Sequence, residues 1–535
     1  MFRGGVNCER RLEKTGVRGY PTGVDRTLTL LTSAFALATG HPVLLAEEKP
    51  VDFAREILPV LSDKCFVCHG PDTRKKDLVR LDSFEGATRD FDGFKAINPE
   101  SLEESEIIVR INDADDPMPP EDAEKQLTAD ERALIERWIR QGGKYAKHWA
   151  FVPPVKPVPP SKGHPIDAFI KENFPESIGF ATAADKSTLA RRLALVLTGL
   201  PPEPELLEFY LKDDSTNAYE RLVEQLLADP RYGEHQARYW LDAVRYGDTH
   251  GLHLDNKRGI YPYRDWVVRA LNKNLPLDQF IEWQLAGDLH PNPTTEQLIA
   301  TGFVRMNPST AEGGVIPAEF QAKNNFDRTE TLGTVFLGMS MLCSRCHTHK
   351  YDPITQTEYF ELMAFFNSTA EGPLDGNKYE YAPVIKVPRD QARWNDWERL
   401  QSERDLLLAK AALTFQNPQG IASEAKQKWD KADIVTRLAM VVDENGPWKK
   451  AGLTIHEAAK RLAKRIGDAE KAFTTTLVAK ELGKPRETKL LQRGEYNLPT
   501  GDPLQPGVLN VMGSLPKGAP RNRLGLAKWL TSRDQ

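Results

Sequence analysis

The sequence predicts a mainly α-helical protein, with a small helical domain linked to a larger helical domain and a charged helical extension. Three observations predict this fold. Phe53, Ile57 and Leu61 recur every four residues, and residues 134–139 place Leu, Ile and Trp on one helical face. Residues 165–370 keep a mostly helical pattern. With 535 residues the chain is too long for one ordinary core, so several domains are expected.

The composition, with 40% hydrophobic and 27% charged residues, is that of a soluble globular protein. The formal net charge is −5, and no segment concentrates basic residues interleaved with aromatic ones. A nucleic-acid partner is therefore not expected.

Residues 1–46 have the layout of a secretory signal peptide. Basic residues up to Arg26 precede an apolar stretch at 27–38 that is too short to span a bilayer, and small residues follow up to Ala46. We therefore expect a periplasmic or secreted protein, with an uncleaved anchor or a buried helix as the alternative. No other stretch reaches membrane-spanning length, so no membrane span is expected in the mature chain.

The first domain is expected at 47–150. Its opening helix leads into Cys65, and a charged, loop-like stretch follows. Thr128 and Glu131 then form a capping-box pattern, which predicts a second helix that ends near Gly142.

A Pro-rich linker follows at 151–160 and leads to a helical domain at 165–370. A charged, Ala-rich helical region is expected at 385–485, with its charges on a solvated face. Residues 486–535 are expected to be the truncated start of a C-terminal domain. Within them, 520–530 reads as the start of a helix with no domain behind it.

The cysteines are the most informative residues of the chain. Of the five, Cys8 lies in the predicted signal peptide. The other four all lie in Cys-x-x-Cys-His strings, which are Cys65-Phe-Val-Cys68-His69 and Cys343-Ser-Arg-Cys346-His347. Even one such string arises by chance with a probability on the order of one in a thousand.

The first string predicts covalent attachment of haem c. Two thiols spaced by two residues on a helical turn can add to the two vinyl groups, and His69 then reaches the iron from the same side. Met118 lies on a stiff proline-rich loop and is the expected ligand of the opposite face, since the domain has no other methionine. Six-coordinate iron suits electron transfer and leaves no position open for a substrate.

A zinc site, a redox dithiol and a disulfide are the alternatives for this string. A zinc site needs a second nearby pair of ligands, and residues 70–150 hold no other cysteine and only His148. A thioredoxin-type dithiol needs a βαβ context, which is absent from the pattern.

The second string predicts a second haem c, with His347 as its proximal ligand. His349 cannot easily reach the opposite face of the same iron. The sequence does not choose among the remaining distal candidates, His250, His253, Met306, Met339 and Met341. One alternative is a metal ion held directly by the two cysteines with His347 or His349 and Asp352, and another is a structural disulfide.

Charged clusters elsewhere are weaker candidates. Asp242, Arg245 and Tyr246 occupy neighbouring helical positions, where an internal ion pair explains them as well as a site does. The same holds for residues 264–265 and 327–328. No Gly-rich phosphate loop, Ser-His-Asp order or paired catalytic carboxylate stands out.

Several long motifs resemble those of the large secreted cytochrome-like proteins that are abundant in planctomycetes. In that family a planctomycete-type cytochrome c domain precedes the domains of unknown function 1549 and 1553. The matching segments are Ile57–Gly70, Asp116–Pro120, His148–Pro154, Leu197–Pro202, Tyr239–Tyr246, Cys343–Ile354, Lys484–Glu495 and Pro520–Arg523. The resemblance implies haem binding and electron transfer. Lys489 stands where the family usually has a histidine, so no role of that imidazole is carried over.

The sequence therefore predicts an exported c-type cytochrome-like haem protein for electron transfer, with one haem c at the first string and a second at the other. It does not identify the redox partner protein. Two alternatives stay open: a haem-dependent oxidoreductase acting on an extracellular substrate such as a carbohydrate, and a non-catalytic envelope scaffold.

Overall fold

The computed structural model describes residues 49–73, 78–175, 177–252, 254–416 and 423–533. Contacts divide the chain into residues 1–49 and residues 50–535. The predicted signal peptide at 1–46 lies outside the described residues.

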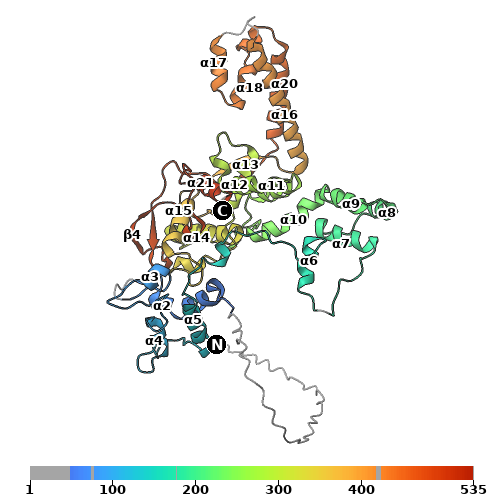
Figure 1. Ribbon diagram of the computed structural model, residues 1–535. Coiled ribbons are helices and arrows are strands. Elements are labelled where there is room, and N and C mark those ends of the chain that lie inside the picture. Colours follow the sequence, from blue (N-terminus) through green and yellow to red (C-terminus); the bar gives the residue numbers. More distant parts are fainter. Residues whose placement is uncertain (1–48, 74–77, 176, 253, 417–422, 534–535) are drawn as a thin grey trace, which may run out of the picture. The chain divides into compact units, whose positions relative to one another are not determined.

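Helices dominate the described residues, which confirms the predicted mainly α fold class (Figure 1). The strands in this part of the chain form two small antiparallel pairs. Among the described helices, none combines the length and the apolar character that a membrane crossing requires.

The first helical region has a core of its own. Phe53 and Ile57 of the opening turns are buried with Trp138 of α5, and the Phe53 and Trp138 ring centroids lie 5.4 Å apart. The capping box predicted at the start of α5 is present, because Thr128 Oγ1 accepts from the Glu131 amide at 3.2 Å and Glu131 Oε2 accepts from the Thr128 amide at 2.7 Å. The elements are η1 (Phe53–Ile57), α1 (Leu58–Lys64), α2 (Phe66–His69), α3 (Phe84–Thr88), α4 (Glu106–Asn112), α5 (Ala129–Arg140) and η2 (Trp149–Phe151).

A second cluster of helices follows the proline-rich linker, and its core includes Ala190, Tyr210 and Leu222. The first long helix of this cluster ends at Thr198, as the Gly-Pro pattern predicts, and Gly199 adopts φ 74° as its cap. A Cβ there would lie 2.2 Å from His235 Nδ1, so the position favours glycine for space as well as for backbone angle. The helices are α6 (Pro165–Glu172), α7 (Lys186–Thr198), α8 (Pro204–Lys212) and α9 (Ala218–Leu227).

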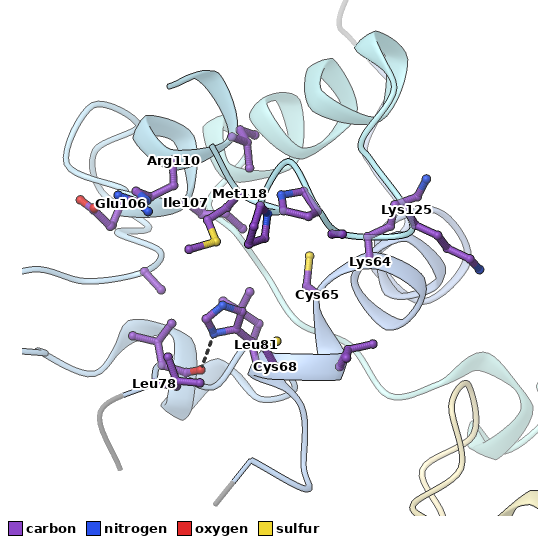
Figure 2. A pocket seen from close by; sticks show the side chains of 18 of the residues that line it. Lys64, Cys65, Cys68, Leu78, Leu81, Glu106, Ile107, Arg110, Met118 and Lys125 are labelled. Carbon is purple, nitrogen blue, oxygen red and sulfur yellow. Dashed lines mark hydrogen bonds between the residues drawn. The ribbon is translucent and has the colours of Figure 1, made fainter. Parts of the chain in front are cut away.

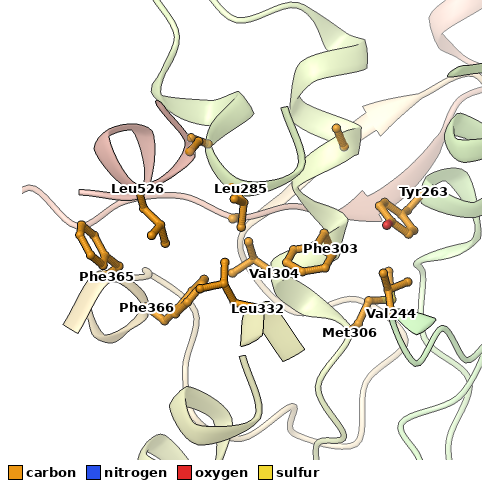
Figure 3. Packing of buried hydrophobic residues seen from close by; sticks show 14 of the residues in the cluster. Val244, Tyr263, Leu285, Phe303, Val304, Met306, Leu332, Phe365, Phe366 and Leu526 are labelled. Atoms are coloured by element: carbon orange, nitrogen blue, oxygen red, sulfur yellow. The ribbon is translucent and has the colours of Figure 1, made fainter. Parts of the chain in front are cut away.

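The largest core draws on segments that are far apart in the sequence (Figure 3). Figure 3 shows Leu526 among the same buried apolar side chains as Leu285 and Phe365. The helix expected near residue 520 is therefore an integral part of this core. The helices of this region are α10 (Pro230–Ala243), α11 (Tyr261–Asn272), α12 (Leu277–Ala286), η3 (Gly287–Leu289), α13 (Thr295–Ala300), η4 (Thr301–Arg305), α14 (Pro317–Phe336), η5 (Leu342–Arg345), α15 (Gln356–Asn367) and α21 (Arg523–Leu530).

The charged region forms a further cluster around Trp429 and Trp448. Its two longest helices, α16 and α20, lie side by side (Figure 1). Strands β1 and β2 pair antiparallel across its two ends, with Val384 opposite Leu477. The elements are β1 (Val384–Val387), α16 (Gln391–Leu413), η6 (Thr414–Gln416), α17 (Ser423–Lys431), α18 (Ile434–Val442), α19 (Pro447–Lys450), α20 (Thr454–Glu470) and β2 (Thr474–Leu477).

The remaining segment adds a second antiparallel strand pair, in which Leu490 lies opposite Thr500. Its elements are β3 (Thr488–Leu491), η7 (Gln492–Gly494), β4 (Pro499–Leu504) and η8 (Asn510–Met512). The domain bounds expected from the sequence stay predictions, since the buried clusters mark cores and not the limits of domains.

Candidate cofactor site

The first Cys-x-x-Cys-His string forms a single helical turn after α1. Cys65 is the cap residue between α1 and α2, and its carbonyl accepts from the amides of Cys68 at 3.1 Å and His69 at 2.9 Å. Positions three and four residues apart share a helix face. The turn therefore places both thiols and the imidazole on one side, as the motif predicts.

Hydrogen bonding fixes the ring of His69. Its Nδ1 lies 3.0 Å from the carbonyl oxygen of Val79, and this bond is dashed in Figure 2. A carbonyl can only accept, so Nδ1 carries the proton and Nε2 keeps its lone pair. A histidine that binds a metal usually donates its other ring N–H in this way. The ring is thus prepared to act as a ligand through Nε2.

A backbone hydrogen bond to α4 positions Met118. Its amide donates to the carbonyl of Arg110 at the end of α4, at 2.9 Å. Figure 2 shows the sulfur atoms of Met118 and Cys65 pointing into the same space. The structure therefore brings Cys65, Cys68, His69 and Met118 together around one cavity.

That cavity has a volume of about 840 Å³, within the range of roughly 300–1,000 Å³ that is typical of small-molecule and cofactor sites. Its walls are mainly apolar, and they include Leu78, Leu81, Phe94, Ile107 and Ile111. A flat, largely apolar cofactor attached through two thiols and an imidazole fits these residues.

Charged side chains line the rim of this cavity. Lys64 lies 3.3 Å from Glu131, and Asp63 accepts from Lys125 at 2.5 Å. Lys350, from a segment far away in the sequence, also pairs with Asp63. Hydrogen bonds from Lys125 and then Lys350 hold the pKa of the Asp63 carboxyl at about 2, well below its usual range.

Burial differs between the two thiols of this string. Cys65 is half-buried and Cys68 is exposed, and both are free. Burial raises the pKa of the Cys65 thiol to about 12, so this group is a thiol and not a thiolate at neutral pH.

The second string lies at η5 in a different setting. Cys343 and Cys346 are both exposed and free, and the Cys346 thiol donates to the carbonyl of Arg493 at 3.1 Å. Nδ1 of His347 lies 2.6 Å from the carbonyl oxygen of Thr348. The two cysteines do not form a disulfide, and within the described residues no group of three or more His, Cys, Asp or Glu side chains could hold a metal ion.

Four of the five distal candidates for the second string lie within the described residues, and each of the four has contacts elsewhere. Both ring nitrogens of His250 are hydrogen-bonded, to Ser309 at 2.9 Å and to the carbonyl of Lys378 at 3.0 Å. Met306 and Met341 are buried in the largest core, and Met339 packs against it. His253 lies outside the described residues.

The charged clusters singled out in the sequence form ion pairs. Arg245 pairs with Asp327 of α14 rather than with Asp242, and Arg264 pairs with Asp265 at 2.9 Å. Arg328 pairs with the buried Glu371. Arg245 adopts φ 60°, a left-handed conformation that is strained for a residue with a side chain.

Sequence reasoning missed one group of residues near the first string. Thr348 and Lys350, just after the second string, contact Asp72 and Asp63, which flank the first. These partners are 276 and 287 residues apart, and no local pattern joins them.

Comparison with known proteins agrees with the motifs. Residues 65–122 match the family model described as Planctomycete cytochrome C, a match that begins at Cys65 and includes Met118. Residues 165–371 match a protein family of unknown function, DUF1549. No curated protein and no solved structure matches the chain. The chain thus contains, in this order, a segment that matches Planctomycete cytochrome C and a longer segment that matches DUF1549.

Proposed function

We propose that this protein is an exported electron carrier that binds haem c at its first Cys-x-x-Cys-His string. One observation carries the proposal: Cys65, Cys68, His69 and Met118 line a single apolar cavity of about 840 Å³. Two thiols, one imidazole and one thioether are the groups that a six-coordinate c-type haem requires. The signal-peptide layout of residues 1–46 supports export.

Each residue has a distinct part in this proposal. Cys65 and Cys68 would attach the cofactor, and His69 would bind its iron through Nε2. The Val79 carbonyl orients the His69 ring by accepting its Nδ1–H at 3.0 Å, and the backbone bond to Arg110 positions Met118. Haem c, when bound, supplies one-electron exchange between ferric and ferrous iron. The apolar walls and the thioether of Met118 would favour the reduced form.

Haem counting with matched variants tests the proposal. The full chain, made in a cytochrome c-maturing host, is assayed by pyridine haemochrome and intact mass. The double variant Cys65→Ser/Cys68→Ser should lose one covalent haem, and the control Cys343→Ser/Cys346→Ser should keep the haem of the first string. Two haems in the parent would extend the proposal to the second string, and none would end it.

Met118 is tested through the reduction potential. Met118→Leu keeps the size of the side chain and removes the thioether, so the potential should fall relative to the parent in an optical redox titration. Met512→Leu, a half-buried methionine packed against the largest core, is the control and should leave the potential unchanged. An unchanged potential in Met118→Leu would show that another group faces the iron.

A further inference from the structure

The segment that follows the second string contacts two carboxylates beside the first string. The amide and the hydroxyl of Thr348 donate to the two carboxylate oxygens of Asp72, at 3.1 and 2.5 Å. The ammonium of Lys350 pairs with Asp63, and the Tyr351 hydroxyl lies 3.5 Å from the same carboxylate. Three side chains of one short segment thus contact two carboxylates.

These contacts lie on both sides of the first string and begin directly after the second. Asp63 precedes Cys65 by two residues, and Asp72 follows His69 by three. Thr348 directly follows His347. The Thr348 amide donates a hydrogen bond to Asp72, which is three residues from His69. Because the chain cannot stretch further, the Cα atoms of His69 and His347 lie no more than about 20 Å apart.

The segment also forms part of the walls of the site. Lys350 lines the cavity of the first string, beside Asp63 and Lys125. A second cavity, of about 710 Å³, is lined by residues of both segments, among them Phe66, Tyr145, Thr348 and Tyr351. The segment after the second string therefore contributes Lys350 to the first cavity and several residues to the second.

We propose that residues 347–352 are a docking segment that couples the second string to the first cofactor pocket, with Thr348 and Lys350 as its positioning residues. The coupling rests on the proposed haem at the first string, whereas the docking does not. Asp63 has Lys125 as a partner from its own domain, so Lys350 is a second cation on one carboxylate. Lys350 thus adds one positive charge beside the pocket, and each added positive charge favours a reduced centre.

Docking depends on the combined contacts rather than on one ion pair. The Lys350 side chain is 36% exposed and that of Asp63 is 24% exposed, and such pairs contribute little by themselves. Thr348 is buried, and it donates two hydrogen bonds to a charged acceptor. Bonds of that kind are stronger than neutral ones.

Three variants of the full matured chain test both parts of the proposal. Thr348→Val and Lys350→Ala remove docking contacts, and only the second removes a charge. Lys125→Ala is the matched control, because it removes the other cation on Asp63 and leaves the docking segment intact. Each protein is examined by hydrogen exchange of peptides spanning 61–73 and 347–352 and by the midpoint potential of the first centre.

The expected pattern separates docking from charge alone. Thr348→Val should raise exchange of the 347–352 peptide by about tenfold and Lys350→Ala by a smaller factor, and both should lower the potential. Lys125→Ala should leave exchange of that peptide unchanged. Unchanged exchange in both docking variants overturns the docking, and raised exchange in Thr348→Val with an unmoved potential overturns the coupling. If the parent carries no haem, the proposed function fails, and the exchange measurements still decide the docking.

Discussion

The two thiols of the first string differ although they are three residues apart. Cys65 lines the cavity, packs against the core of the first helical region and is half-buried, and burial raises its pKa to about 12, while Cys68 is open to solvent. Only the thiolate of a cysteine is nucleophilic. The environment of each residue, and not the shared motif, therefore sets the chemistry of the bare chain.

This difference predicts unequal alkylation. In protein made without the cofactor, iodoacetamide at pH 8 should modify Cys68 well before Cys65, because Cys65 holds very little thiolate and is less accessible. Peptide mass spectrometry over a time course measures both rates. Urea-unfolded protein is the control, in which the two rates should converge. Equal rates in the folded protein would contradict the burial of Cys65.

Asp63 predicts a pH dependence of the docking contact. Its folded pKa of about 2 lies below the ordinary value of 3.8, so its carboxylate stabilises the folded chain above pH 4. That contribution is lost as the pH falls from about 4 to 2, because protonation breaks the pairs with Lys125 and Lys350. Stability measured over this range should fall less steeply in Asp63→Asn than in the parent. Identical slopes would show that the pairs with Lys125 and Lys350 do not stabilise the folded chain.

At the scale of elements, a capping box in its first turn stabilises helix α5. Thr128 and Glu131 satisfy two amides reciprocally, and Lys64 of α1 pairs with Glu131 at 3.3 Å. Thr128→Ala should lower the free energy of unfolding of the first helical region by about 1 kcal/mol. Chemical denaturation of the Thr128 variants and the parent, followed by tryptophan fluorescence, measures the loss. Thr128→Ser keeps the acceptor and should restore most of the stability, and equal loss in both variants would point to a cause other than the cap.

At the scale of the whole molecule, Arg523 ties the last described helix to the largest core. Its side chain is fully buried and bonds Asp288 at 2.7 Å, Glu481 at 2.9 Å and the carbonyl of Leu285 at 2.9 Å. Three segments that are distant in sequence therefore meet at one guanidinium.

Removing that guanidinium should destabilise the core. Arg523→Ala leaves the nearly buried Asp288 carboxylate without its counter-ion and the half-buried Glu481 without its partner, and the loss of a buried counter-ion typically costs about 3–5 kcal/mol. Thermal unfolding of the full chain measures the effect. Arg521→Ala is the control, since Arg521 makes an exposed bond to the Pro506 carbonyl and should change stability little. Equal effects of the two variants would contradict the role of the buried network.

The sequence predicted those features that interactions between neighbouring residues determine. The capping box at Thr128 and the helix end at Gly199 follow from bonds and backbone angles within a few residues, and both are confirmed. Cys65, Cys68 and His69 line one cavity together because the motif itself sets their spacing, whereas Met118 reaches that cavity through the tertiary fold. The contact between Asp72 and Thr348 could not be predicted, since its two ends lie in segments that no periodicity relates.

The burial of Arg523 also bears on the order in which the chain becomes folded. Leu285 and Arg523, which donates to its carbonyl, are separated by 238 positions, so all of the intervening chain is synthesised before this contact can exist. Contacts of such long sequence separation slow folding, and apolar surface stays exposed while they are missing. Until residues 523–530 emerge, the largest core should stay incompletely packed, and its exposed apolar side chains would be a target for a chaperone.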